Sequence, residues 1–124
     1  MGSAWVSTLL GLKIDASAAM NLDSSDSLVS IGQTVFDSNL STIEIDGVVQ
    51  HLSARQSEIL TILALNIGQT VERENILKSV WGNDSYANSL ALNVQITYLR
   101  KLLAADTTIT IVSLKKRGIV LEVK

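Results

Sequence analysis

Three short runs of β-type residues lie between positions 28 and 52. The runs read VSIGQTVF, STIEI and VVQHL, and Asp37-Ser38-Asn39 separates the first run from the second. Asp46-Gly47 separates the second run from the third, and this dipeptide supplies the positive φ values that a two-residue hairpin turn requires. The pattern predicts a small antiparallel sheet.

A helix is predicted directly after this sheet. Ser53-Ala54-Arg55-Gln56 has the spacing of a capping box, in which the Ser53 hydroxyl accepts from the backbone of Gln56 and the Gln56 side chain reaches back. Asn66-Ile67-Gly68 should end the helix. Between these signals lie the apolar residues of a stripe that should face the core: Ile59, Leu60, Ile62, Leu63 and Leu65.

A second helix is predicted from Glu72 to Trp81, and Gly82 marks its end. Its inward-facing residues should be Ile76, Leu77 and Val80.

A third and longer helix is predicted from about Ser89 to Ala104. At about 100° per residue, one narrow arc of this helix should face the core, and it holds Leu92, Ile96, Leu99 and Leu103. The opposite arc holds Leu90, Asn93, Thr97, Arg100 and Lys101, with Val94 beside them and Gln95 and Tyr98 toward the margin. This mixture of amides, a hydroxyl, cations and apolar side chains is unusual for an ordinary solvated face.

Two further β-type runs close the chain. Ile109–Leu114 and Ile119–Val123 are predicted strands, and Lys115-Lys116-Arg117-Gly118 between them is a cationic hairpin tip. The order of elements predicts an α+β fold: a winged helix-turn-helix with an N-terminal small antiparallel β-sheet, three helices and a C-terminal β-hairpin wing.

Residues 1–27 differ in composition from the rest of the chain. Positions 15–27 read DASAAMNLDSSDS, which is typical of a linker. The apolar run from Ala4 to Leu12 is too short to span a bilayer, and no basic residue precedes it as in a signal peptide. We expect residues 1–27 to be a linker or remnant of a preceding domain, and residues 28–124 to form the winged-helix domain. We also expect the protein to be cytoplasmic, without a membrane partner.

Charge is distributed unevenly along the chain. The whole sequence has a net charge of -2. Residues 88–124 hold six cationic and two anionic side chains, a local charge of +4, whereas residues 1–87 hold four and ten, a charge of -6. Such an asymmetry indicates an anionic partner, for which nucleic acid is a candidate.

The composition gives little support for catalysis. The chain has no cysteine and one histidine, His51, so it has neither a thiol nucleophile nor a Cys-based zinc site. It also has no Gly-rich phosphate loop and no nucleophile paired with a base. We expect no enzymatic activity, no metal and no cofactor, and we expect His51 to be a surface residue or one with its hydrogen bonds satisfied.

Several segments together resemble the C-terminal effector domain of OmpR/PhoB-type response regulators, in the version found in Bacteroides-type bacteria. The segments are LSARQSEIL after the leading sheet, VERENIL before SVWG, YLRKLL late in the third helix, and the closing strand-turn-strand with Gly118. The resemblance covers roughly Ile31 to Val123, and its specificity lies in the order and spacing of segments that are individually weak. It implies the sequence-specific DNA-binding output domain of a bacterial transcriptional regulator in a two-component system.

The resemblance also implies roles for individual residues. Its third helix would be the recognition helix, and Trp81 and Arg100 stand where the family contacts phosphate. Residues expected to bind double-stranded DNA are Trp81, Asn88, Asn93, Val94, Gln95, Thr97, Tyr98, Arg100, Lys101, Lys115, Lys116 and Arg117. The loop that touches RNA polymerase in some members would comprise Gly82, Asn83, Asp84, Ser85 and Tyr86. A homodimer on DNA is also expected, because members often bind direct repeats.

The chain departs from the family pattern on its DNA-facing side. The departures are Leu90, Thr97 and Tyr98 where many members carry arginine, Gln95 for a common histidine, Lys116 for a wing glycine, and Ile119 for an aromatic residue. They predict fewer phosphate and guanine contacts, and therefore weaker or more wing-dependent binding or a less G-rich site. The alternative is a winged-helix domain for protein–protein interaction through Leu90, Val94 and Tyr98, with weak or lost DNA binding.

Four residues near the predicted interface allow a structural interpretation. Trp81 is a core anchor at the end of the second helix, a phosphate contact, or both. Arg73 and Glu74 are expected to support the start of that helix. For Tyr98, packing against the sheet and pointing toward DNA both stay open.

Overall fold

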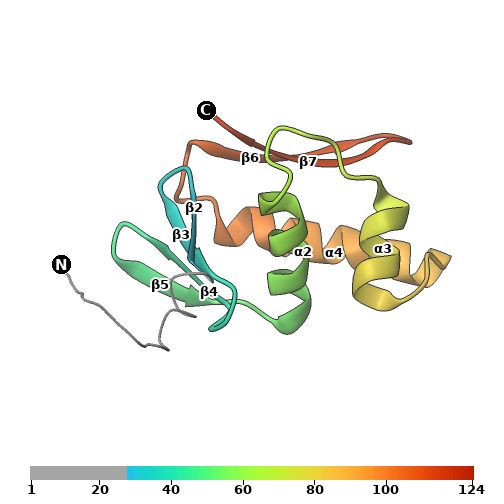
Figure 1. Cartoon of the computed structure of the whole chain (residues 1–124), viewed down its shortest axis with the longest axis horizontal. Helices are drawn as coiled ribbons and strands as arrows, with labels where there is room; N and C mark the ends of the chain where they lie inside the picture. The colour runs from blue at the N-terminus through green and yellow to red at the C-terminus, as the bar shows by residue number, and fades with distance from the viewer. Residues whose placement is uncertain (1–27) are drawn as a thin grey trace, which may run out of the picture.

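A four-stranded sheet, three helices and a β-hairpin form residues 28–124, the part of the chain that the computed structural model describes (Figure 1). The sheet lies at one end of the molecule, the helices follow, and the hairpin runs along one side of them. This is the predicted winged helix-turn-helix with an N-terminal sheet. The expectations for residues 1–27 lie outside the described residues.

The sheet consists of β2 (Leu28–Ile31), β3 (Thr34–Asp37), β4 (Thr42–Ile45) and β5 (Val48–His51), paired antiparallel in chain order. Asp46 and Gly47 form the predicted hairpin turn, with φ values of 52° and 80°. The expectation of one continuous run VSIGQTVF is wrong, because Gly32, with φ 58°, and Gln33 form a turn between β2 and β3. A side chain at Gly32 would also collide with the Thr108 hydroxyl.

The first helix, α2 (Ala54–Ala64), begins with the predicted capping box. The backbone N–H of Gln56 donates to the Ser53 hydroxyl (3.2 Å), and the Ser53 N–H donates to Gln56 Oε1 (2.9 Å). An N-cap of this kind contributes about 1 kcal/mol. Leu65 was expected in the buried stripe, and this prediction is wrong. The helix ends at Ala64, and Leu65 is 78% exposed at the C-cap.

The two remaining helices are α3 (Arg73–Trp81) and α4 (Tyr86–Leu102). Ile76 and Leu77 of α3 are buried as predicted, and Gly82, with φ 89°, ends the helix. The start of α4 lies before the expected Ser89 because Ser85 caps the helix, its hydroxyl accepting from the Asn88 N–H (3.2 Å). The Gly82–Ser85 connection is therefore shorter than predicted.

The C-terminal hairpin, β6 (Ile109–Leu114) and β7 (Gly118–Val123), confirms the two predicted strands. Val71, in the segment before α3, pairs with Ile119: the Val71 N–H donates to the Ile119 carbonyl (2.8 Å), and the Ile119 N–H donates back (2.9 Å). A side chain at Gly118 would collide with the Val71 carbonyl oxygen. The hairpin is thereby fixed to the helical part of the domain.

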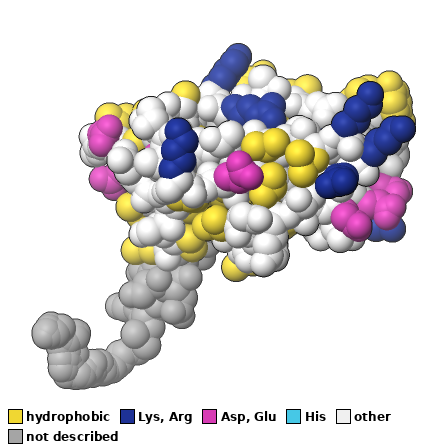
Figure 2. Space-filling view, turned by 90° about the horizontal axis from the view of Figure 1, so that it is seen from above, with side chains coloured by type: hydrophobic (Ala, Val, Ile, Leu, Met, Phe, Trp, Pro, Cys, Tyr) yellow, Lys and Arg dark blue, Asp and Glu magenta, His cyan; other side chains and the backbone are white. Residues whose placement is uncertain are grey.

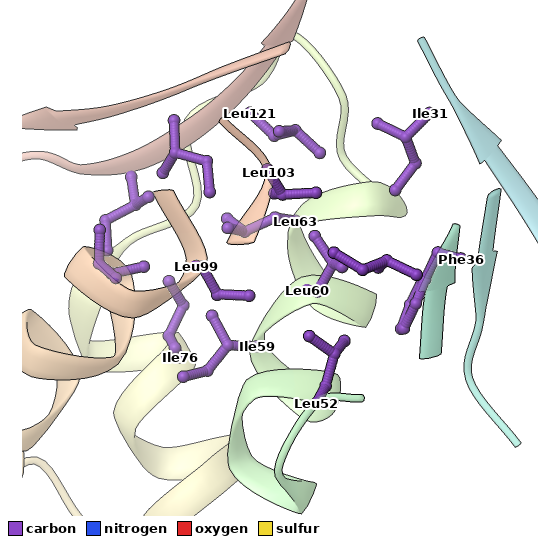
Figure 3. Packing of buried hydrophobic residues seen from close by; sticks show 14 of the residues in the cluster. Ile31, Phe36, Leu52, Ile59, Leu60, Leu63, Ile76, Leu99, Leu103 and Leu121 are labelled. Atoms are coloured by element: carbon purple, nitrogen blue, oxygen red, sulfur yellow. The ribbon is translucent and has the colours of Figure 1, made fainter. Parts of the chain in front are cut away.

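One hydrophobic core joins the sheet, the helices and the hairpin (Figure 3). Phe36 of β3, Leu60 of α2, Leu99 of α4 and Leu121 of β7 are all buried in it. The four residues predicted to face the core from the third helix are buried, and none exceeds 3% exposure: Leu92, Ile96 and Leu99 of α4, and Leu103 at its C-cap. The core thus fixes which side of α4 faces outward.

A buried carboxylate connects the N-terminal sheet to the base of the hairpin. Asp106, 1% exposed, accepts hydrogen bonds from the Gln33 N–H (2.8 Å), the Thr34 hydroxyl (2.8 Å), and the N–H and hydroxyl of Thr108. Burial by itself would raise the pKa of Asp106, but these hydrogen bonds, led by that from the Thr108 side chain, outweigh burial and lower the pKa. No sequence motif marks Asp106, because Thr34 lies 72 residues away along the chain.

Candidate nucleic-acid interface

The side of α4 that faces away from the core is exposed, as predicted. Its apolar residues Leu90, Val94 and Tyr98 are 48%, 50% and 49% exposed. Asn93 and Thr97 are exposed on the same helix. Because the core residues of α4 occupy the other side, this face is free to contact a ligand.

The two polar residues of this face offer different groups to a ligand. The Thr97 hydroxyl donates to the Asn93 carbonyl oxygen (3.0 Å), so its proton is used within the helix. The Asn93 side-chain amide makes no hydrogen bond to any residue of the described part of the chain. Asn93 therefore keeps both a donor and an acceptor for a base edge.

Tyr98 lies at the helix surface beside a cation. The ammonium of Lys101 is 5.9 Å from the centroid of the Tyr98 ring, near the limit of a cation–π contact. With half of its surface in solvent, Tyr98 fits the interpretation in which it points outward better than the one in which it packs on a sheet.

Arg100 connects α4 to the hairpin. Its Nε donates to the carbonyl oxygen of Ile111 in β6 (3.0 Å). The other guanidinium nitrogens make no hydrogen bond among residues 28–124. The phosphate contact expected of Arg100 stays a prediction. It is compatible with the bond to Ile111, because the other guanidinium nitrogens can still donate to a phosphate.

The tip of the hairpin carries three exposed cations, Lys115, Lys116 and Arg117. The Arg117 N–H donates to the Leu114 carbonyl (3.1 Å) and closes the turn, in which Lys116 has φ 64°. Figure 2 shows Lys and Arg side chains gathered at the end of the molecule where Figure 1 places this tip, with acidic side chains beside them. The sheet-bearing end shows no such concentration of cations in this view.

An open hollow of about 300 Å³ lies between the hairpin tip and the start of α3. Its lining residues are Glu72, Arg73, Glu74, Lys116 and Arg117. Arg73 donates from Nη2 to both the carbonyl oxygen (2.9 Å) and the hydroxyl (2.7 Å) of Ser89. This geometry supports the structural interpretation of Arg73, which fastens α3 to the first turns of α4.

Trp81 is partly buried against the core at the end of α3. The guanidinium of Arg55 stands 4.7 Å from the Trp81 ring centroid, and Arg55 Nη1 donates to the Val80 carbonyl (3.3 Å). Within the described residues the Trp81 indole N–H has no hydrogen-bond partner. Trp81 is thus a core anchor that retains a free donor, and its phosphate contact stays a prediction. No pattern along the chain indicates the Arg55 contact, since α2 and α3 meet only in the folded chain.

The segment expected to contact RNA polymerase is divided between a connection and a helix. Gly82, Asn83, Asp84 and Ser85 form the connection, whereas Tyr86, 79% exposed, opens α4. Asn83 Oδ1 accepts from the Ser85 N–H (3.1 Å) and from the Asn88 amide (2.8 Å), which gives the connection a defined shape. The Asn88 side-chain nitrogen is engaged here, so a DNA contact through this nitrogen requires its bonds to Asn83 to open, whereas Asn88 Oδ1 has no partner among residues 28–124.

Gln95 lies at the margin between the exposed and buried sides of α4. It is half-buried, and its Oε1 is buried without a hydrogen-bond partner among the described residues. A contact between Gln95 Oε1 and DNA would therefore require this oxygen to become exposed, and a contact of Gln95 with DNA stays a prediction.

Within residues 28–124, no group of three His, Cys, Asp or Glu side chains is placed to hold a metal ion. His51 is exposed at the end of β5, as expected. In the same part of the chain no helix has the length and apolar character needed to cross a membrane.

Comparison with known proteins gives one consistent family. Residues 47–121 match the family model described as "Transcriptional regulatory protein, C terminal". The chain is similar to the transcriptional regulatory protein RprY of Bacteroides fragilis, with 32% identity over 71% of this chain and 37% of that protein. The chain thus spans little more than a third of this curated relative.

Two solved structures show the same fold. The DNA-binding domain of CpxR from Escherichia coli has a TM-score of 0.69 and 22% identity, covering 77% of this chain and 96% of that one. The DNA-binding domain of RstA from Klebsiella pneumoniae, in complex with the RstA box, has a TM-score of 0.66, 24% identity and the same two coverages.

Proposed function

The chain belongs to the family of C-terminal domains of transcriptional regulatory proteins, of the OmpR/PhoB type that its sequence resembles, and we propose on this basis that residues 28–124 bind double-stranded DNA sequence-specifically. In this proposal α4 enters the major groove and the tip of the β6–β7 hairpin contacts the sugar–phosphate backbone. We further propose that this domain is the output part of a two-component response regulator.

The observation that carries the proposal is the bond between Arg100 and Ile111. It fastens the hairpin and its three cations to the helix whose outer face carries free base-reading groups. A major groove is about 12 Å wide and admits one α-helix, and a hairpin beside that helix then meets the flanking phosphates. Specificity would come from α4, and much of the affinity from the hairpin.

Salt dependence tests the proposed role of the hairpin tip. Binding of the whole chain to duplex DNA is measured by fluorescence anisotropy at several salt concentrations. Each cation that neutralises a phosphate contributes about -0.9 to the slope of log K against log salt. Replacing Lys115 or Arg117 singly by glutamine should therefore make the slope less steep by about 0.9 per phosphate contact.

Lys124 is the matched control for these variants. It is exposed at the far end of β7, away from the tip, so Lys124→Gln should leave the slope unchanged. An equal effect of all three substitutions would mean that only overall charge matters, and a slope near zero for the unaltered chain would exclude DNA as the ligand.

The proposal also covers a protein partner, the oligomeric state on DNA and the location of the protein. The exposed Tyr86 and the Gly82–Ser85 connection are a candidate contact for RNA polymerase, supported by the defined shape of this connection. Two copies of the domain would bind adjacent half-sites as a homodimer on DNA. A domain with this role acts in the cytoplasm, where bacterial DNA lies, and performs no catalysis.

A further inference from the structure

Leu90, Val94 and Tyr98 form an apolar row along the outer face of α4. Their spacing of i, i+4 and i+8 places them on successive turns of one helix face, and each keeps about half of its surface in solvent. Single exposed apolar residues are ordinary, but a contiguous row on one face indicates a surface that another molecule covers.

The charges around the row favour DNA over a protein as this molecule. Lys101 lies beside the row, with its ammonium 5.9 Å from the Tyr98 ring centroid, and the hairpin fixed by Arg100 brings three further cations. Lysine is depleted at the centres of protein–protein interfaces, because burying its charge is costly. A duplex accommodates the same arrangement, since its phosphates flank the groove that holds the apolar groups.

The hydrogen-bonding groups beside the row suit adenine better than guanine. Guanine is usually read by arginine or lysine, and α4 has one of each in its last turn. The Nε of Arg100 donates to Ile111, and the Lys101 ammonium lies 5.9 Å from the Tyr98 ring centroid. Asn93 has a free amide, the group that pairs with both the N6 and N7 positions of adenine. Thr97 has used its hydroxyl proton within the helix, which leaves a methyl group for apolar contact.

We propose that α4 reads A·T base pairs in the major groove, with Leu90 and Val94 packed on the C5-methyl groups of thymine and Asn93 bonded to adenine. The thymine methyl is the apolar group that the major-groove edges of the four bases present, so it is the complement of an apolar row. This assignment rests on the proposed function, because it requires that the domain bind duplex DNA through α4.

Deoxyuridine substitution tests the assignment. A duplex is first selected from a random pool by the whole chain, and its thymines are then replaced one at a time by deoxyuridine, which removes the methyl and keeps every hydrogen-bonding group. The assignment predicts an A·T-rich selected site in which each contacted thymine loses about fourfold in affinity, the factor for burying one methyl-sized group.

The variant Val94→Ala tests whether a side chain of α4 makes the contact with the thymine methyl. This variant should bind the thymine duplex more weakly and become insensitive to deoxyuridine at one position, since the side chain that touches that methyl is gone. Val49→Ala is the matched control, because Val49 is 53% exposed on β5 and Val94 is 50% exposed on α4. Val49→Ala should keep the affinity and the full sensitivity to deoxyuridine.

The possible results separate this assignment from the function on which it rests. Tight binding that is indifferent to deoxyuridine, or a selected site without A·T pairs, overturns the assignment and leaves DNA binding intact. Absence of binding to any duplex at low salt overturns both. If sedimentation without DNA instead shows self-association that Leu90→Ala abolishes, the row is a contact between copies of the chain and the assignment is wrong.

Discussion

Lys116 occupies a backbone conformation that favours glycine, and it does so at the tip of the hairpin, with φ 64°. A side chain in this left-handed region costs about 1–2 kcal/mol. The chain therefore has a cation where glycine would be favoured. A phosphate contact of Lys116 would explain why this strain is retained.

Lys116→Gly should therefore change stability and binding in opposite directions. We expect the free energy of unfolding to rise by as much as about 1 kcal/mol, because glycine adopts positive φ without strain. Affinity for DNA should fall, because one cation is lost. Urea denaturation and anisotropy titration measure the two effects.

Lys115→Gly provides the comparison, because Lys115 does not have positive φ. This variant loses a cation without relieving strain, so both its affinity and its stability should fall. A Lys116→Gly domain less stable than the original would contradict the interpretation of Lys116.

Asp106 is a second residue whose effect can be stated in advance. Asp106→Asn keeps the shape but removes the charge that four hydrogen-bond donors surround, and we expect a loss of about 1–3 kcal/mol of unfolding free energy at pH 7. The exposed Glu58 serves as control, and Glu58→Gln should change stability little.

The pH dependence of this loss has a defined sign. Because the folded pKa of Asp106 is lowered from 3.8, its charged form stabilises the fold fully above that value, and the contribution is lost as the pH falls through the folded pKa. The difference between wild type and Asp106→Asn, followed by urea denaturation, should therefore shrink below pH 3.8. A difference that grows on acidification would show that the carboxylate is not stabilised as described.

At the scale of elements, the sequence predicted what depends on nearby residues. The capping box at Ser53 and Gln56 and the turn at Asp46 and Gly47 are local, and both are present. The helical period of 3.6 residues was sufficient to divide α4 into a buried and an exposed side, because its core residues all lie on one side of the helix.

Errors arose where the decisive contact is distant in sequence or where a signal is incomplete. The turn at Gly32 lacks the usual Asn, Asp or Pro, and the close approach of Thr108 that requires glycine there appears only in the folded chain. Ser85 was missed as the cap of α4 because position 88 is Asn rather than the Glu or Gln of a capping box.

In the candidate site, too, the exposed face of the helix could be predicted from the sequence, whereas the contacts between elements could not. The exposure of Asn93, Val94 and Thr97 follows from the helical period. The bond from Arg100 to Ile111 and the bond from Arg73 to Ser89 join separate elements, so no pattern along the chain could indicate them.

At the scale of the whole molecule, the charges that oppose DNA binding and those that favour it are close together. The first 87 residues carry a net charge of -6, and the last 37 carry a net charge of +4. Nevertheless, Glu72 and Glu74 line the same hollow as Lys116 and Arg117 at the hairpin tip. Phosphate approaching the tip therefore meets both signs of charge, and a well-fixed hairpin position matters more than overall attraction. Arg100 and the pairing of Val71 with Ile119 provide that position.

The central claim is that α4 and the hairpin contact one duplex together, and site-directed DNA cleavage measures this directly. The chain has no cysteine, so a single cysteine can carry an iron–EDTA cleavage reagent at a chosen position. Three exposed small residues suit this purpose: Ala87 on α4, Ser113 on β6, and Ser30 on the sheet as the control.

With a selected duplex, reagents at Ala87→Cys and Ser113→Cys should each cut the bound DNA, at two different positions within about one helical turn of 10 base pairs. The reagent at Ser30→Cys should leave the duplex intact. Cleavage from position 113 without cleavage from position 87, or equal cleavage from all three positions, would contradict the joint contact of α4 and the hairpin with DNA.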